Sequence, residues 1–143
     1  MTVIEVTGLR KAYAGREVVR GVDLCVARGE VFALLGPNGA GKTTTTEILE
    51  GHRRRDGGEV RVLDADPGTA GRQWRARIGI VLQSTGEFDE LTVAEVVHHF
   101  AAYYPAADDP DAIIDRVGLK AKRRARTHTL SGGQKRRVDV ALG

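Results

Sequence analysis

The sequence contains a single cysteine, Cys25, and aromatic residues make up only 5% of its 143 residues. One cysteine can form neither an internal disulfide nor a zinc cluster built from several cysteines, so both kinds of framework are excluded. Cys25 lies in the apolar run VDLCVA, residues 22–27, and no motif surrounds it. We therefore expect it to be a small buried hydrophobic residue and not a nucleophile.

Long hydrophobic runs are also missing. The apolar run at residues 31–35 falls far short of the roughly 18 residues that a membrane span requires, and the N-terminal segment MTVIEVTGLR lacks the apolar core of a signal peptide. With 41% hydrophobic and 29% charged residues, the composition is typical of one soluble globular domain. We therefore expect a cytoplasmic protein.

The excess of positive charge is small. The formal net charge is +3, and basic residues gather at 53–55, 120–126 and 135–137. Such clusters can indicate nucleic-acid binding. Because charge alone is non-specific and the few aromatic residues offer little surface on which bases could stack, we interpret the clusters as solvated faces and expect no direct nucleic-acid binding.

Short antiparallel strands are predicted near the N-terminus. Residues 2–7 and 17–26 are rich in β-branched residues and flank the turn-like pair Ala14-Gly15, a pattern typical of two antiparallel strands. The segment GEVRVL, residues 58–63, predicts another strand.

Two further runs have a different pattern. EVFALLG, residues 30–36, and IGIVLQ, residues 78–83, are almost continuously apolar. Such runs are typical of strands that are buried on both faces of a parallel sheet. We therefore predict that these segments belong to the core of an α/β fold.

Helices are indicated by capping residues as well as by periodicity. The first is expected at about 41–50 with Gly51 beyond its end, and a short helical stretch is expected around 73–77. Three later helix starts carry capping residues: Thr92 with Glu95, Asp109 with Pro110, and Ser131 with Gln134. Apolar residues follow two of these starts at helical spacing: Val93, Val96, Val97, Phe100 and Tyr104, then Val138, Ala141 and Leu142.

The segment GPNGAGKT, residues 36–43, fits the phosphate-binding pattern G-x-x-x-x-G-K-[ST] between a predicted strand and a predicted helix. Its glycines allow the backbone to approach a phosphate and to direct successive N–H groups at it. Lys42 is expected to neutralise the β- and γ-phosphates, and Thr43 to ligate Mg²⁺. The predicted ligand is a nucleoside triphosphate. The expected binding residues are Gly36, Pro37, Asn38, Gly39, Ala40, Gly41, Lys42, Thr43 and Thr44.

The string LSGGQ, residues 130–134, follows this loop with a helical segment between them. In this arrangement it resembles the signature sequence of ATP-binding cassette (ABC) ATPases, and the segments GEVRVLDADP and LTVAE are similar to those of bacterial drug-exporter ATP-binding subunits. The resemblance covers essentially the whole chain. It implies an α/β fold with a P-loop NTPase core, in which an N-terminal antiparallel β subdomain and the core occupy about 1–84. A helical subdomain with the signature would occupy about 85–143. Asp64 stands where glycine is common in the family, and aspartate tolerates left-handed backbone angles.

The resemblance also implies roles for single residues. Tyr13 matches the aromatic residue on which adenine stacks, and Gln83 matches the glutamine that ligates Mg²⁺ and helps to position the attacking water. Ser131 and Gly133 belong to the signature, which receives the γ-phosphate of ATP held by a second subunit. The implied ligands are ATP and Mg²⁺, and the implied partner is a second ATP-binding subunit in a homodimer. Lys42, Gln83, Ser131 and Gly133 are the expected catalytic residues.

Transport is the function that the resemblance favours. The chain would couple ATP binding and hydrolysis to transport, with export favoured, through a separate membrane permease at the inner face of the cell membrane. Residues 86–91 either contact that permease or form an ordinary loop in which Phe88 folds inward. The alternative is a non-transport ABC ATPase acting on nucleic acid or the ribosome. The sequence lacks the long heptad-rich insertion of the chromosome and repair members, and it lacks the cysteine pairs of the excision-repair members. A ribosome-associated member with two cassettes in tandem is not excluded. Assignment to the P-loop kinases or GTPases would leave the LSGGQ segment unexplained.

The helix after Ser131 shows no stop signal before Gly143, so we expect these residues to be part of a longer subunit. In the family an acidic strand, a catalytic glutamate and a switch histidine follow the signature helix, and the resemblance finds no match for them here. We therefore expect an incomplete core sheet, poor solubility and no turnover of ATP by residues 1–143 alone.

Overall fold

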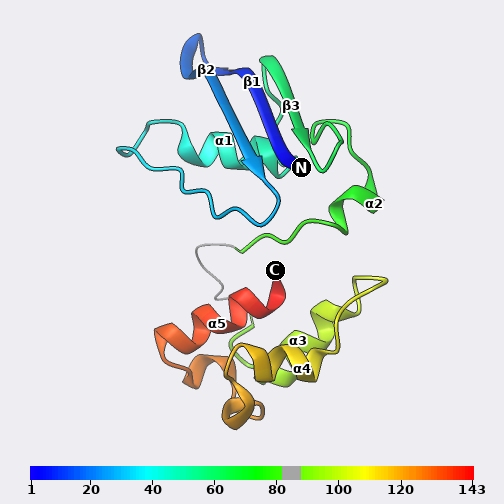
Figure 1. Ribbon diagram of the computed structural model, residues 1–143. Coiled ribbons are helices and arrows are strands. Elements are labelled where there is room, and N and C mark those ends of the chain that lie inside the picture. The colour runs from blue at the N-terminus through cyan, green and yellow to red at the C-terminus, as the bar shows by residue number, and fades with distance from the viewer. Residues whose placement is uncertain (82–87) are drawn as a thin grey trace. The chain divides into compact units, whose positions relative to one another are not determined.

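The computed structural model describes residues 1–81 and 88–143 (Figure 1). The chain divides into two compact units, Met1–Arg75 and Ala76–Gly143. The expected division near residue 84 stays a prediction.

The first unit contains a three-stranded antiparallel sheet in the order β2-β1-β3. Strands β1 (Thr2–Tyr13) and β2 (Arg16–Ala27) form a hairpin, and β3 (Gly57–Val62) pairs with the other side of β1. The hairpin turns at Ala14 and Gly15, whose φ angles of 47° and 78° are the left-handed angles that suit tight turns between twisted strands. The three strands predicted from β-branched residues are thus confirmed.

The core of this unit lies between the sheet and helix α1 (Lys42–Leu49), which crosses one face of the sheet (Figure 1). Short helix α2 (Arg72–Arg75) follows β3 and buries Trp74, whose Nε1 donates to the carbonyl oxygen of Val62 at 2.8 Å. Both helices begin and end within two residues of the predicted positions. The buried apolar residues are Val6, Leu9, Val19, Val26, Ile48, Val60, Val62 and Trp74.

The turn after β3 has left-handed backbone angles at two residues that are not glycine. The φ angle is 51° at Leu63 and 66° at Asp64. Aspartate at the second position fits the expectation from the sequence, because its short polar side chain tolerates these angles better than most.

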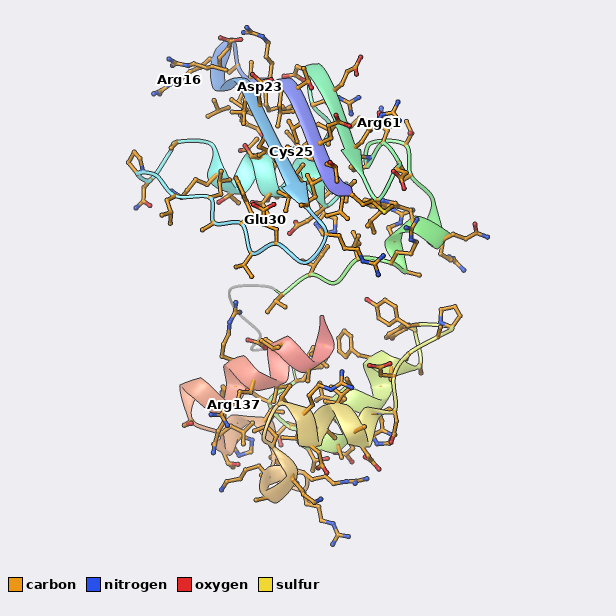
Figure 2. All side chains as sticks on the ribbon, in the orientation of Figure 1. Arg16, Asp23, Cys25, Glu30, Arg61 and Arg137 are labelled. Atoms are coloured by element: carbon orange, nitrogen blue, oxygen red, sulfur yellow. The ribbon has the colours of Figure 1, made fainter. Side chains whose placement is uncertain are left out.

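The opposite face of the sheet is polar, and Cys25 lies on it. The register places Glu5 beside Cys25 and Arg61, and Figure 2 shows these two side chains on β2 and β3, on either side of β1. Cys25 is exposed, so the prediction that it is buried is wrong. Successive side chains of a strand point to opposite faces, so the burial of Val26 places Cys25 outside.

Two predicted strands are missing from the described residues. Residues 30–36 and 78–81 have no regular secondary structure, and residues 82–83 lie outside the described part. The prediction of core strands at 30–36 and 78–81 is therefore wrong for this structure. An apolar run forms a strand only where a neighbouring strand completes its hydrogen bonds, and the sheet of the described residues contains only β1, β2 and β3.

The second unit is helical. Its elements are α3 (Val93–Ala101), α4 (Pro110–Arg116), the 3₁₀ turns η1 (Lys120–Lys122) and η2 (Thr127–Thr129), and α5 (Gly132–Leu142). Thr92 with Glu95 and Ser131 with Gln134 form the two predicted capping boxes, and Asp109 caps α4. The buried core residues are Val93, Val96, Val97, Ile114, Leu119, Leu130 and Val138.

Within residues 1–81 and 88–143, none of the helices has both the length and the hydropathy of a membrane span.

Candidate nucleotide-binding site

The phosphate loop leads directly into α1. Gly41 is the N-cap of this helix, with φ 82° and ψ 8°. A Cβ at this position would lie 2.5 Å from the carbonyl oxygen of Val18, so only glycine fits the space as well as the backbone angle. No described side chain caps the N-terminus of α1, so the N–H groups of its first turn are available to a ligand.

Lys42 turns back into this loop. Its Nζ donates hydrogen bonds of 2.7 Å to the carbonyl oxygens of Gly36 and Pro37. An ammonium group has three donors, so these bonds hold the loop around the charge and leave one donor for a further acceptor. The positive charge therefore lies beside the N-terminus of α1, whose dipole also favours an anion.

The four consecutive threonines of α1 differ in their surroundings, and Thr44 is half-buried. Thr45 is buried, and the hydroxyl of Thr46 donates to the carbonyl oxygen of Lys42 at 3.1 Å. Thr43 is exposed, and its hydroxyl has no hydrogen-bond partner among the described residues. Thr43 therefore fits an Mg²⁺ site that phosphate oxygens and water complete. No group of three or more His, Cys, Asp or Glu in residues 1–81 and 88–143 could hold a metal ion by itself.

Tyr13 ends β1, and the residue is 40% exposed. Two cations lie over its ring: Lys11 Nζ is 5.5 Å from the ring centroid and the guanidinium carbon of Arg53 is 5.3 Å away. Arg53 is not among the site residues predicted from the sequence, because the basic cluster at 53–55 indicates only a solvated face there. The signal that could have identified it is its place directly after the helix that follows the phosphate loop.

The other expected site residues lie elsewhere. Gln83 is outside the described residues, and Ser131 and Gly133 belong to the second unit. Ser131 Oγ accepts from the backbone N–H of Gln134 at 3.3 Å, while its own N–H donates to Gln134 Oε1 at 3.0 Å. The Ser131 hydroxyl hydrogen thus stays available to a ligand at the N-terminus of α5. A Cβ at Gly133 would meet no atom within 4 Å, so the described residues leave room for close approach there.

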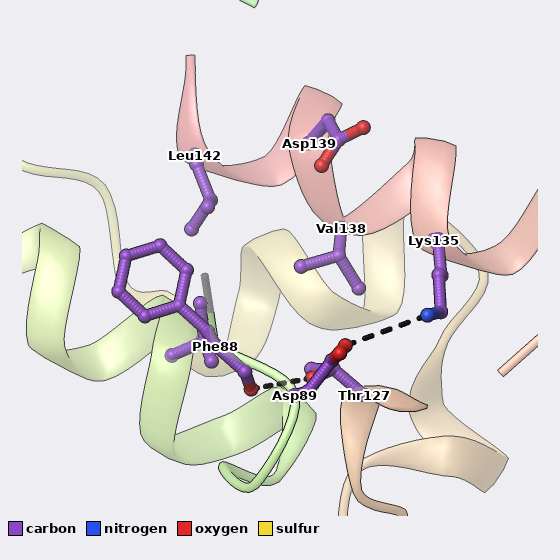
Figure 3. Close-up of a pocket in the computed structure, with 8 residues that line it drawn as sticks. Phe88, Asp89, Thr127, Lys135, Val138, Asp139 and Leu142 are labelled. Atoms are coloured by element: carbon purple, nitrogen blue, oxygen red, sulfur yellow. Dashed lines mark hydrogen bonds and ion pairs between the residues drawn. The ribbon is translucent and has the colours of Figure 1, made fainter. Parts of the chain in front are cut away.

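Phe88 folds inward and does not stand free among charged residues. Its ring packs edge to face against Phe100 at 5.2 Å, and its carbonyl oxygen accepts from Thr127 Oγ1 at 2.6 Å. It borders a cavity of about 20 Å³ beside the ion pair of Asp89 and Lys135 (Figure 3). A cavity of that volume holds about one water and no nucleotide, so the phosphate loop remains the candidate site.

Comparison with known proteins gives relatives along nearly the whole chain. The family model described as ABC transporter matches residues 19–143. A fluoroquinolones export ATP-binding protein of Mycobacterium tuberculosis is 38% identical over 143 residues, which is 98% of this chain and 46% of the relative. The Nod factor export ATP-binding protein I of Bradyrhizobium diazoefficiens is 37% identical, with 96% and 47% covered. The chain thus spans about half the length of these relatives.

Solved structures agree on the fold. The cbiO1 protein of Clostridium perfringens, part of the ABC transporter complex cbiONQ, is 28% identical with a TM-score of 0.84, covering 99% of this chain and 60% of that one. A structure of an ATP-binding subunit of an ABC transporter matches with a TM-score of 0.83 at 23% identity, covering 99% and 61%. These matches show the fold of an ABC ATPase domain and so confirm the predicted α/β fold class. The core sheet is incomplete in the described residues, whose sheet contains only β1, β2 and β3.

Proposed function

Because the chain belongs to the ABC transporter family, which is a family of ATPases, we propose that it forms the nucleotide-binding part of a transporter's ATP-binding subunit. The observation that carries this proposal is the phosphate loop, in which Gly41 caps α1 without a side chain and Lys42 places its ammonium inside the loop. In the whole subunit, ATP binding and hydrolysis would drive transport through a separate membrane permease.

Residues 36–44 bind the triphosphate in this proposal. Backbone N–H groups of the loop and of the first turn of α1 donate to phosphate oxygens, and Lys42 neutralises the β- and γ-phosphates. Among the described residues, the Thr43 hydroxyl is the ligand that would hold Mg²⁺, since Thr43 is exposed. A Mg²⁺ ion held there would supply positive charge that offsets the negative charge of the phosphate groups.

The base and the γ-phosphate have separate partners in this proposal. Tyr13 stacks on the adenine, because it is the exposed aromatic residue at the end of β1. The hydroxyl of Ser131 and the backbone at Gly133 receive the γ-phosphate of ATP held by a second copy, so the active form is a homodimer. The capping box supports this role because it fixes Ser131 Oγ at the start of α5. Gln83 would contribute to the metal and water site.

Export is the direction that the relatives support, since two of them are named as export ATP-binding proteins. The substrate contacts would belong to the permease, and the subunit would lie at the cytoplasmic face of the membrane beside it. No feature of the described residues favours an action on nucleic acid or the ribosome.

We also propose that residues 1–143 alone do not turn over ATP. The acidic strand, the glutamate base and the switch histidine that the resemblance implies have no match in this sequence. Glu87, Asp89 and Glu90 are the carboxylates that could replace the base. Asp89 pairs with Lys135 and Glu90 with Arg126, and Glu87 lies outside the described residues. Phosphate release by the purified chain should equal that of its Lys42→Ala variant, and turnover that depends on Lys42 would refute this proposal.

Titration calorimetry with Mg²⁺-ATP tests the site. Lys42→Ala removes charge-assisted hydrogen bonds to two phosphates and should weaken ATP binding by about 10- to 100-fold. Thr46→Ala, on the same helix but bonded to its own backbone, is the matched control and should bind as wild type does. Equal affinities of wild type and Lys42→Ala would overturn the assignment.

A further inference from the structure

The ring of Tyr13 is held by cations that are themselves anchored. Arg53 does not reach the ring as a free side chain, because its Nε donates to the carboxylate of Glu47 at 2.5 Å. This bond raises the pKa of Arg53 above its ordinary value. Glu47 lies on α1, the helix whose first residue is Lys42. The phosphate loop and the ring of Tyr13 are therefore linked through one helix and one ion pair.

The turn after α1 directs Arg53 back toward its own helix. Gly51 has a φ of 76°, and a Cβ there would lie 2.7 Å from the carbonyl oxygen of Pro67, so glycine is required. The backbone N–H groups of His52 and Arg53 both donate to the carbonyl oxygen of Glu47, at 2.9 and 3.1 Å. The backbone thus fixes Arg53 beside the residue that binds its side chain.

The second cation is anchored in a similar way. Asp56 accepts from Lys11 Nζ at 2.7 Å and from the backbone N–H of Ala12 at 2.8 Å, and its own N–H donates to the carbonyl oxygen of Arg10 at 2.9 Å. These bonds tie the end of β1 to the segment that carries Arg53. The backbone on both sides of the contact between Arg53 and Tyr13 is therefore fixed before any ligand binds.

We propose that Arg53 is a positioning residue for purine binding: its guanidinium, held by Glu47, fixes the ring of Tyr13 in the orientation in which the ring stacks on adenine. This inference rests on the proposed role of Tyr13. With both cations in place the tyrosine is still 40% exposed, so ring surface remains for a base. A ring that is held in advance loses less conformational freedom on binding.

The test is a double-mutant cycle in the full-length subunit, with affinities measured for Mg²⁺-ATP and for Mg²⁺-tripolyphosphate, which has no base. Arg53→Met removes the charge and keeps the length of the side chain, and Arg53→Lys restores the charge. Arg54→Met is the matched control, because this neighbouring arginine is exposed. The same Arg53→Met change is repeated in a Tyr13→Ala background.

Arg53→Met is expected to weaken ATP binding by about two- to fivefold, the range of an exposed cation–π contact, and to leave tripolyphosphate binding unchanged. Arg53→Lys should recover part of the loss, and Arg54→Met should show none. In the Tyr13→Ala background the effect of Arg53→Met should disappear, because Arg53 acts through the ring.

Three results would overturn the inference. Tighter ATP binding by Arg53→Met would mean that the guanidinium occupies the ring surface that the base needs. An equal loss for ATP and tripolyphosphate would mean that Arg53 acts on the phosphates or on folding. Persistence of the effect without Tyr13 would mean that the ring is not involved. Failure of the proposed function looks different, because wild type would then bind neither ligand, and that result would remove both proposals.

Discussion

At the scale of single residues, the phosphate loop contains two glycines that have the same φ angle and different surroundings. Gly39 and Gly41 both have a φ of 82°. A Cβ at Gly39 would meet nothing within 4 Å, whereas one at Gly41 would lie 2.5 Å from the carbonyl oxygen of Val18. The pair therefore separates the cost of the backbone angle from the cost of a clash.

We predict that Gly39→Ala lowers the free energy of unfolding by about 1 to 2 kcal/mol, the cost of a left-handed angle with a Cβ. Gly41→Ala should cost about 1 to 3 kcal/mol more, because β2 must also move to accommodate the methyl group. Urea unfolding of the two variants beside wild type measures both numbers. Equal losses would show that Val18 yields without cost and that the close approach at Gly41 is unimportant.

At the scale of elements, the two capping boxes differ in charge. The carboxylate of Glu95 accepts from the backbone N–H and the hydroxyl of Thr92, and these bonds hold the pKa of Glu95 below its ordinary value of 4.5. The box of α5 uses the neutral Gln134 instead. Only the first box can therefore respond to pH.

We predict that the charge of Glu95 stabilises the protein above pH 4.5 and that this contribution disappears as the pH falls through the lower pKa of the folded state. The sign follows because the unfolded chain binds the proton first. Glu95→Gln keeps an acceptor oxygen but no charge, so its urea midpoint should lie below that of wild type at neutral pH and converge with it in acid. Gln134→Ala is the control, and its loss should not change with pH. A constant gap between Glu95→Gln and wild type would contradict the prediction.

Elements that are set by their own sequence were predictable, and elements that depend on distant partners were not. The caps at Thr92 and Ser131 and the hairpin turn at Ala14 involve neighbours in the sequence, so their residue types identify them. The runs at 30–36 and 78–83 predict burial but do not specify a pairing strand, and their described residues form none.

The same distinction applies to the candidate site. The phosphate loop is one continuous motif, and its residues could be assigned from the sequence alone. Arg53 reaches Tyr13 from the turn after α1, and no sequence pattern marks that contact. The prediction that Cys25 is buried was wrong for a different reason, since an apolar run does not tell which of its residues face outward.

At the scale of the whole molecule, the first unit exposes an apolar segment. Val31 is 97% exposed and Leu35 87% exposed, and the segment between them contains Phe32 at 46%. Contiguous exposed apolar residues without regular structure favour association between chains.

We predict that the 143-residue chain associates in a concentration-dependent manner and that the double substitution Val31→Lys with Leu35→Lys reduces this association. Light scattering across a dilution series measures it. Tyr103→Lys, which removes another large exposed side chain, is the control and should have little effect. If the double variant scatters as strongly as wild type, another surface is responsible.

The burial of Trp74 has a practical consequence for watching this molecule unfold. It is the single tryptophan of the chain, and it lies in the core of the first unit with its indole bonded to Val62. Its fluorescence therefore reports on that unit alone, whereas far-ultraviolet circular dichroism is weighted toward the helices of the second unit. The native chain thus carries a separate optical signal for each half, and non-coincident melting curves would reveal that the halves come apart one at a time.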